Sequence, residues 1–406
     1  MLKKFKNEKG ITKMQFVIII VIIVISIILA SMGIIFILKD NEYIKSSESV
    51  RESYKDEDNE KKLIGAQTES ETLDTTNVIL ELSEDGIYVP VPKGFTASTI
   101  LGEIKVNEGF VIKQRNNGSV TSEVNEFVWI TVDDASLGEM YNTAGEEKNL
   151  SGVLTKTSLY SNVRLNDEDS LIYSPATPGV ELGLREPDVL VDEDTDTKYI
   201  SILNYANIQE MADGMVEEYN TVYESIKKYN GFYIGRYELT GTVDFPTVQK
   251  GQNVITEQTW YDLKKACTNV VTGEEYGAQS TMIYGNQWDE IMDWLKQTKF
   301  KGEEEKVDVD SRSWGNYTDS TENVNTTSSV KLQKSGYNEE WKANNIYDLA
   351  GNYDEWTQEA FDSRGRVYRG CGSDYSSYEY TASSRYIDLV WACNSYGTSR
   401  PVLYIK

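Results

Sequence analysis

The longest apolar stretch of the chain runs almost unbroken from Phe16 to Leu38. A helix over this stretch is about 30 Å long or slightly more, which is enough to cross a bilayer. Five lysines precede the stretch, whereas Asp40 and Glu42 follow it. Because cytoplasmic flanks are rich in Lys and Arg, the pattern predicts a single-pass protein of the cell membrane. Residues 1–15 are then cytoplasmic, and the rest of the chain is extracellular.

Two features bear on how this segment is processed. A signal peptide is disfavoured, because the apolar run is too long and no Ala-x-Ala site follows it. The sequence Lys9-Gly-Ile-Thr12 resembles the start of type IV prepilins, in which a peptidase cuts after the glycine. That family usually carries Glu where this chain has Gln15, and Lys13 is an unusual charge there. The segment is therefore either a prepilin-like leader over residues 1–10 or part of a plain membrane anchor.

Residues 39–77 are charged and polar with sparse aliphatic groups, which indicates a solvated stalk. Folded structure is expected from Val78, where short β-rich runs separated by Gly and Asn turns begin. These runs predict strands within Tyr88–Phe95, 109–112 and 125–132.

Apolar residues at three- and four-residue spacing predict helices further on. The first contains Met211, Met215, Tyr219, Val222 and Ile226, and two others cover Trp260–Thr268 and Gln287–Lys296. A strand is predicted over Gly231–Glu238, where apolar and polar residues alternate. Residues 133–200 are acidic and loop-like, and residues 301–335 form a polar insertion. The mixture predicts an α+β ectodomain over residues 78–406.

The composition of the chain excludes several kinds of ligand and of catalysis. A net charge of −25 argues against nucleic acid, since phosphate binding needs clustered Lys and Arg. The complete absence of histidine removes His-dependent catalysis and His-ligated metals, so a bound metal would be a hard cation on oxygen ligands. Cys267 is expected in the core. Cys371 and Cys393 either pair outside the cell or are unrelated thiols.

The last third of the chain carries a family resemblance. The segments Asn345-Ile-Tyr-Asp-Leu-Ala-Gly-Asn-Tyr-Asp-Glu-Trp-Thr357, Arg366-Val-Tyr-Arg-Gly370 and Ser399-Arg-Pro401 resemble the formylglycine-generating-enzyme (sulfatase-modifying-factor) family, a variant of the C-type-lectin fold. The resemblance implies that fold over roughly residues 84–406. The family's enzymes use a cysteine pair just after Arg-Gly-Gly-Ser, whereas this chain has no cysteine in Gly372–Tyr378. We therefore expect the scaffold without its oxidase chemistry, and no copper.

A calcium site is predicted in the first of these segments. Asp348, Gly351, Tyr353 and Glu355 offer two carboxylates and two backbone carbonyls around one turn, a donor set that suits Ca²⁺. The arrangement resembles the calcium loop of the same family, with Asp in place of Asn. The alternative is that the turn is purely structural and its acids are solvated. Trp314, Trp341, Trp356 and Trp391 are expected mainly in the core, and Arg400-Pro401 is expected to be structural.

The region from about residue 363 to 406 has the composition of an antibody paratope, with rigid aromatic residues interleaved with Ser, Gly and Asn. Its placement also resembles the variable proteins of diversity-generating retroelements, which display a mutated patch on this fold. The alternative is a loop-rich surface that exposes tyrosines by chance. The candidate ligand-binding residues are Tyr375, Tyr378, Tyr380, Tyr386, Trp391 and Tyr396.

The sequence thus predicts a surface-displayed recognition protein without catalytic activity. The membrane is contacted through Phe16–Leu38, and the partner is an extracellular protein or glycan. Two alternatives stay open. One is a sulfatase-modifying-type oxidase, which needs a thiol pair, and the other is a minor pilin-like subunit, which needs cleavage after Gly10.

Overall fold

The computed structural model describes residues 75–115, 124–141, 164–165, 171–172, 199–320, 332–360, 365–377 and 380–406. All of them belong to one of the two compact units into which the chain divides. Within this described part, no helix is both long and apolar enough to span a membrane. The predicted leader, the predicted span Phe16–Leu38 and nearly all of the predicted stalk lie outside the described residues.

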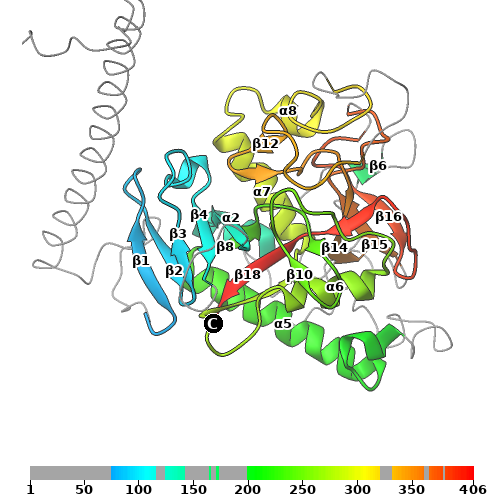
Figure 1. Ribbon diagram of the computed structural model, residues 1–406, viewed down its shortest axis with the longest axis horizontal. Helices are drawn as coiled ribbons and strands as arrows, with labels where there is room; N and C mark the ends of the chain where they lie inside the picture. The colour runs from blue at the N-terminus through cyan, green and yellow to red at the C-terminus, as the bar shows by residue number, and fades with distance from the viewer. Residues whose placement is uncertain are drawn as a thin grey trace, which may run out of the picture. The chain divides into compact units, whose positions relative to one another are not determined.

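The described part is a mixed α+β structure dominated by sheets (Figure 1). The strands are β1 (Val78–Leu82), β2 (Tyr88–Pro92), β3 (Phe95–Ala97), β4 (Val111–Gln114), β5 (Glu126–Thr131), β6 (Arg164–Leu165), β7 (Leu171–Ile172), β8 (Gly231–Gly235), β9 (Thr240–Gly241), β10 (Pro246–Thr247), β11 (Ala278–Met282), β12 (Lys342–Ala343), β13 (Ile346–Tyr347), β14 (Asp354–Ala360), β15 (Gly365–Arg369), β16 (Tyr386–Leu389), β17 (Gly397–Ser399) and β18 (Pro401–Ile405). The helices are α2 (Asp134–Tyr141), α5 (Ile208–Tyr229), α6 (Trp260–Asn269), α7 (Gly285–Gln297) and α8 (Glu305–Asp308), with 3-10 turns η1 (Val106–Glu108) and η3 (Ser201–Leu203).

The largest sheet has six strands in the order β11-β18-β8-β5-β4-β3 and curls into a half-barrel. Every neighbouring pair in it is antiparallel. A second sheet has the order β16-β15-β14-β17, in which β14 and β17 run parallel. Only Arg400 separates β17 from β18, so the chain passes directly from the second sheet into the first, where β18 lies between the edge strand β11 and β8.

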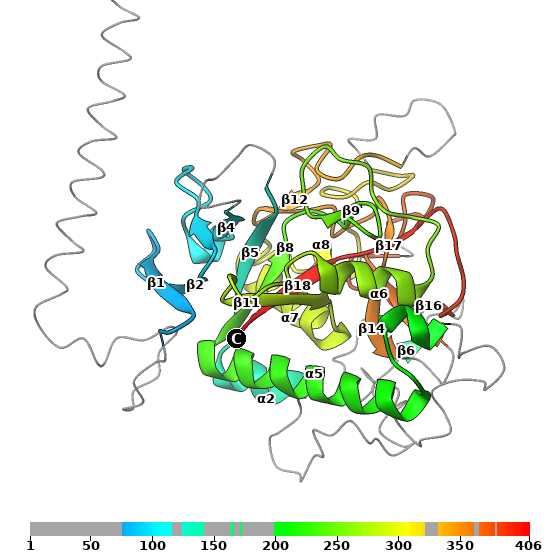
Figure 2. The same ribbon diagram turned by 60° about the horizontal axis from the view of Figure 1, so that its bottom comes forward.

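The three predicted helices are confirmed as α5, α6 and α7. Helix α5 begins at the cap Asn207, whose side chain accepts a hydrogen bond from the Glu210 amide, and ends at Asn230 in the left-handed conformation. Its predicted apolar face is buried and packs against β8 and β18 (Figure 2). Thr259 and Asp262 form a capping box at the start of α6, which packs on β11.

The predicted strands are also present, with small differences in their bounds. The run Tyr88–Phe95 is interrupted after β2 because Gly94 turns the chain with φ +87°. Helix α2 contradicts the expectation of loop structure after residue 133. Asp133 accepts a hydrogen bond from the Ser136 amide at 2.8 Å, and α2 packs against α5 and α7. Two turns of helix are too short to give a clear periodic signal.

The core agrees with the sequence interpretation. Trp314, Trp341 and Trp356 are buried, as is Cys267, whereas Trp391 is only partly buried. The Trp260 indole donates a hydrogen bond to the Thr357 carbonyl at 2.9 Å and so links α6 to β14. The buried core is therefore continuous between the helices and the second sheet.

Candidate functional site

Three of the predicted ligand-binding tyrosines lie together, Tyr375 and Tyr380 on the connection from β15 to β16 and Tyr386 as the first residue of β16. The ring centroids of Tyr375 and Tyr380 are 4.5 Å apart, and Tyr386 lies 6.3 and 6.5 Å from them. Tyr386 also stacks at 6.5 Å on Tyr368, whose ring is 3.9 Å from that of Trp356 in the core. We call Tyr375, Tyr380 and Tyr386 the aromatic surface.

The predicted residues differ in exposure. Tyr386 and Tyr396 are 38% and 39% exposed, whereas Tyr375, Tyr380 and Trp391 are partly buried. Trp391 and Tyr396 lie on the connection from β16 to β17, and within the described residues they make no ring contact with the aromatic surface. Tyr378 lies outside the described residues.

A buried ion-pair network holds both ends of the connection that carries this surface. Arg369, at the end of β15, donates to Asp289 at 2.7 Å and lies 3.4 Å from Glu359. Arg385, just before β16, donates to Glu359 at 2.8 Å and also pairs with Asp289. Because all four side chains are buried and paired, the connection is anchored at both ends. No local sequence pattern indicates this network, because Asp289 is 80 and 96 residues away from Arg369 and Arg385.

The middle of the connection is fixed by a second set of contacts. The amide of Ser377 donates to Asp319 at 2.9 Å, and its hydroxyl donates to Asp310 at 2.9 Å. The amide of Ala382 donates to the Ser311 hydroxyl at 3.0 Å. Part of the polar insertion predicted over residues 301–335 thus binds the connection that carries Tyr375 and Tyr380.

An acidic group lies beneath the aromatic surface. Asp354 is 5% exposed, and its Oδ1 has no hydrogen-bond partner in the described part of the chain. Burial, together with the charges of Asp374 and Asp388, raises the pKa of Asp354 to about 7, while a hydrogen bond from the Gly372 amide opposes the shift. The carboxyl is therefore partly protonated near neutral pH. Sequence reasoning missed Asp354, because it is adjacent to the predicted metal ligand Glu355.

Three residues of the predicted calcium loop, Asp348, Gly351 and Tyr353, precede β14, and Glu355 is the second residue of that strand. Asp348 is buried and accepts from the Gly336 amide at 2.7 Å and from the Ser335 hydroxyl at 3.3 Å, and its Oδ1 has no partner among the described residues. Gly351 has φ +71°, and a Cβ there would lie 2.3 Å from the Asn316 carbonyl oxygen, so this turn requires glycine. Tyr353 is 9% exposed.

Glu355 is engaged with Arg400. Both carboxylate oxygens accept from the Arg400 guanidinium, which also donates to the Gly235 and Tyr347 carbonyls at 3.0 and 2.9 Å. Arg400 is therefore structural, as predicted. Burial raises the pKa of Glu355, although the charge of Arg400 opposes the shift.

Glu238 and Asp348 lie near Glu355 and Arg400, and the four side chains form a buried cluster. Burial and the neighbouring charges of Asp348 and Glu355 raise the pKa of Glu238 well above its usual range. Burial also raises the pKa of Asp348 to about 6. In the described part of the chain, no group of three or more Asp, Glu or Cys side chains is arranged to hold a metal ion. The calcium site stays a prediction.

All three cysteines are free thiols, so Cys371 and Cys393 are not paired. Cys371 is buried with φ +55°, and burial raises the pKa of its thiol well above the usual value. Burial likewise raises the pKa of Cys267 to about 12. Neither buried thiol is present as a thiolate near neutral pH, and the thiolate is the reactive form.

Comparison with known proteins adds no family assignment. No protein-family model matches this chain, and no curated protein matches it in sequence.

Proposed function

We propose that this chain is a membrane-anchored, surface-displayed recognition protein that binds an extracellular protein or glycan through the aromatic surface. The observation that carries the proposal is the contact between Tyr375, Tyr380 and Tyr386, next to a connection whose two ends are held by buried Arg–carboxylate pairs. Tyrosine offers a large contact area at little entropic cost, and a rigid support lowers the cost of binding further.

We also propose that the ectodomain is a non-catalytic member of the sulfatase-modifying-factor family with its C-type-lectin-like fold. Three structural roles support this. Asn345 donates to the carbonyls of Gly102, Glu108 and Gly109, Gly351 makes a turn that only glycine fits, and Arg400 pairs with Glu355. These residues belong to the motifs that carry the resemblance. The non-catalytic role is supported by the absence of histidine from the sequence and by the burial of Cys371.

The binding proposal is tested with the full chain displayed on cells and probed with a glycan array and a panel of purified extracellular proteins. The triple variant Tyr375→Ala/Tyr380→Ala/Tyr386→Ala should lose capture of any ligand found, since aromatic anchors cost about 2 kcal/mol or more each at a hot spot. The control Tyr337→Ala removes a tyrosine that is 54% exposed and lies outside the aromatic surface. A folded triple variant with unchanged affinity would refute the proposal.

We also propose that Asp348 and the adjacent carbonyls bind calcium. Bound calcium would stabilise the native state by mass action. Chelator should then lower the melting temperature of the full chain. Asp348→Asn removes the carboxylate charge, so the variant should melt at the same temperature with calcium and with chelator. Identical melting of the wild type with calcium and with chelator would count against the site.

A further inference from the structure

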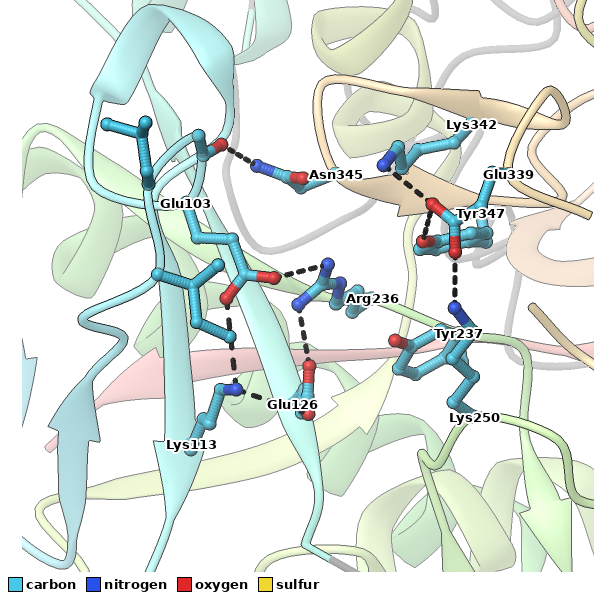
Figure 3. A pocket seen from close by; sticks show the side chains of 13 residues that line it. Glu103, Lys113, Glu126, Arg236, Tyr237, Lys250, Glu339, Lys342, Asn345 and Tyr347 are labelled. Atoms are coloured by element: carbon cyan, nitrogen blue, oxygen red, sulfur yellow. Dashed lines mark hydrogen bonds and ion pairs between the residues drawn. The ribbon is translucent and has the colours of Figure 1, made fainter. Parts of the chain in front are cut away.

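A cavity of about 410 Å³ lies away from the aromatic surface, between two walls of charged side chains. Figure 3 shows Glu103, Lys113 and Glu126 on one side, and Tyr237, Lys250, Glu339, Lys342 and Tyr347 on the other. Arg236, directly after β8, extends between them. The first wall comes from β4, β5 and the turn before η1, and the second comes from the β8–β9 connection, the loops after β10 and before β12, and the strands β12 and β13.

The acceptors in this cavity are already engaged. Glu103 accepts from Arg236 at 2.7 Å and from the Ser98 hydroxyl at 2.5 Å. Glu126 accepts from Arg236 at 2.7 Å. Glu339 accepts from Lys342 at 2.9 Å and from the Tyr347 hydroxyl at 2.7 Å, and it also pairs with Lys250. Each of these carboxylates therefore already accepts at least one hydrogen bond, and a positively charged ligand would compete with the cations paired with them.

Two donors, by contrast, have no hydrogen-bond partner among the described residues. Tyr237 is 2% exposed, and its ring is stacked at 5.1 Å on that of Tyr347. Figure 3 shows its hydroxyl turned toward the space between the two walls. Burial raises the pKa of Tyr237, so the hydroxyl keeps its proton and can donate it.

Lys113 is the second such donor. Its ammonium group lies 3.8 Å from Glu103 and 3.7 Å from Glu126, which is beyond hydrogen-bonding distance. An ammonium group carries three N–H donors, so Lys113 can bind a new acceptor without giving up a short contact. Its side chain is 18% exposed, which leaves it accessible from the cavity.

The balance of charge around the cavity is opposite to that of the whole chain. Four cations line it (Lys113, Arg236, Lys250 and Lys342) against three carboxylates (Glu103, Glu126 and Glu339), which leaves a net charge of +1. The whole chain has a net charge of −25. A concave, locally positive site on an acidic protein concentrates anions against the surrounding field. Leu101, 82% exposed at the rim, adds apolar surface for the carbon skeleton of a ligand.

We propose that this cavity is a binding site for a small, polar solute that carries an oxyanion, held by Lys113 and the Tyr237 hydroxyl. The volume is near the lower end of the range for small-molecule pockets, so it suits a solute of about the size of a sugar acid. The oxyanion is either the carboxylate of such a solute or free inorganic phosphate. The site is separate from the aromatic surface, so the two proposals stand independently.

Titration calorimetry of the full chain at low ionic strength, with sodium glucuronate, sodium phosphate and uncharged glucose as probes, tests the proposal. At least one oxyanion should bind, its affinity should fall as salt is added, and glucose should bind at least about tenfold more weakly. Binding of glucuronate alone would identify a sugar-acid site, and binding of phosphate alone would identify a free-anion site. Binding of both would show that the cavity recognises the oxyanion itself, whether or not a sugar is attached to it. Absence of binding by both oxyanions at millimolar concentration would overturn the proposal.

Two variants test whether Tyr237 and Lys113 contact the bound oxyanion. Tyr237→Phe should weaken oxyanion binding roughly two- to tenfold, and Lys113→Gln should weaken it about tenfold or more and reduce its salt dependence. The control Lys306→Gln removes a surface lysine on α8 that does not line the cavity, so affinity should be unchanged. Unchanged affinity in both cavity variants would overturn the assignment. Should Tyr237→Phe fail to fold, Lys113→Gln still decides, because its side chain is partly exposed and makes no hydrogen bond in the described structure.

Discussion

At the scale of single residues, several carboxyl groups are buried where water cannot solvate them. Arg400 is the cation that compensates Glu238, Asp348 and Glu355, so this cluster is under-neutralised and the pKa values of its acids are raised. Among the described residues, no cation lowers the pKa of Asp354 in this way, and two more carboxylates lie near it. Folding therefore costs free energy at these positions whenever the groups are ionised.

Asp354 makes this cost measurable. Its pKa is about 7 in the folded protein against an ordinary value of 3.8. Because the folded state binds the proton more tightly, the contribution of Asp354 to stability is present below pH 4 and is lost as the pH rises through 7. Asp354→Asn should remove this dependence and stabilise the protein at pH 8 relative to the wild type, by at most about 4 kcal/mol.

The measurement is the free energy of unfolding in urea at pH 5 and pH 8, followed by tryptophan fluorescence. The matched control is Asp244→Asn, a substitution at an exposed aspartate in the β9–β10 turn. If the wild type and Asp354→Asn lost stability equally between the two pH values, Asp354 would not be the group that titrates.

At the scale of elements, helix α7 supports the aromatic surface although it lies far from it in sequence. Asp289 on α7 binds Arg369 and Arg385, the residues at the two ends of the connection that carries Tyr375 and Tyr380. Removing one partner of a buried pair leaves the others desolvated and unpaired. The order of this connection should therefore depend on a helix that contributes no residue to the aromatic surface.

Asp289→Asn should lower the free energy of unfolding by about 3 kcal/mol and speed up amide hydrogen exchange in residues 370–377 and 380–385. Asp293→Asn on the same helix is the control, because its pair with Lys296 is partly exposed and contributes less than about 1 kcal/mol. Faster exchange throughout the molecule, with no excess in this connection, would show that Asp289 acts on global stability alone.

Local signals predicted some elements and not others. The apolar spacing of Met211 to Ile226 predicted α5 because a periodic face is written into consecutive turns. Arg400 was expected to be structural because it precedes a proline and a short apolar strand. The pairs of Arg369 and Arg385 with Asp289 join positions 80 and 96 residues apart, which no local pattern reveals. The cavity at Tyr237 was missed for the same reason, since its walls come from distant segments.

At the scale of the whole molecule, the proposed function depends on which side of the membrane the folded unit occupies. Five lysines before Phe16 and the acids after Leu38 predict that residues 40–406 face outward. The large negative charge suits a domain displayed in solvent, where it favours solubility.

Protease added to intact cells should therefore remove the folded unit, as followed by an antibody against residues 78–406. A cytoplasmic marker protein that stays intact is the control for cell integrity. Full protection of the folded unit in cells with an intact marker would reverse the proposed orientation.

The position of β18 has a consequence for biosynthesis. This strand lies between the edge strand β11 and β8, so β11 cannot join the six-stranded sheet until residues 401–405 have been made. The segments that carry the aromatic surface are synthesised just before it, and β8 and β11 leave the ribosome without this shared neighbour. Synthesis that stops before β18 thus releases a chain with open edges on β8 and β11, and such edges favour aggregation and degradation. The six-stranded sheet is therefore complete only in chains that contain residues 401–405, which are made after the aromatic surface.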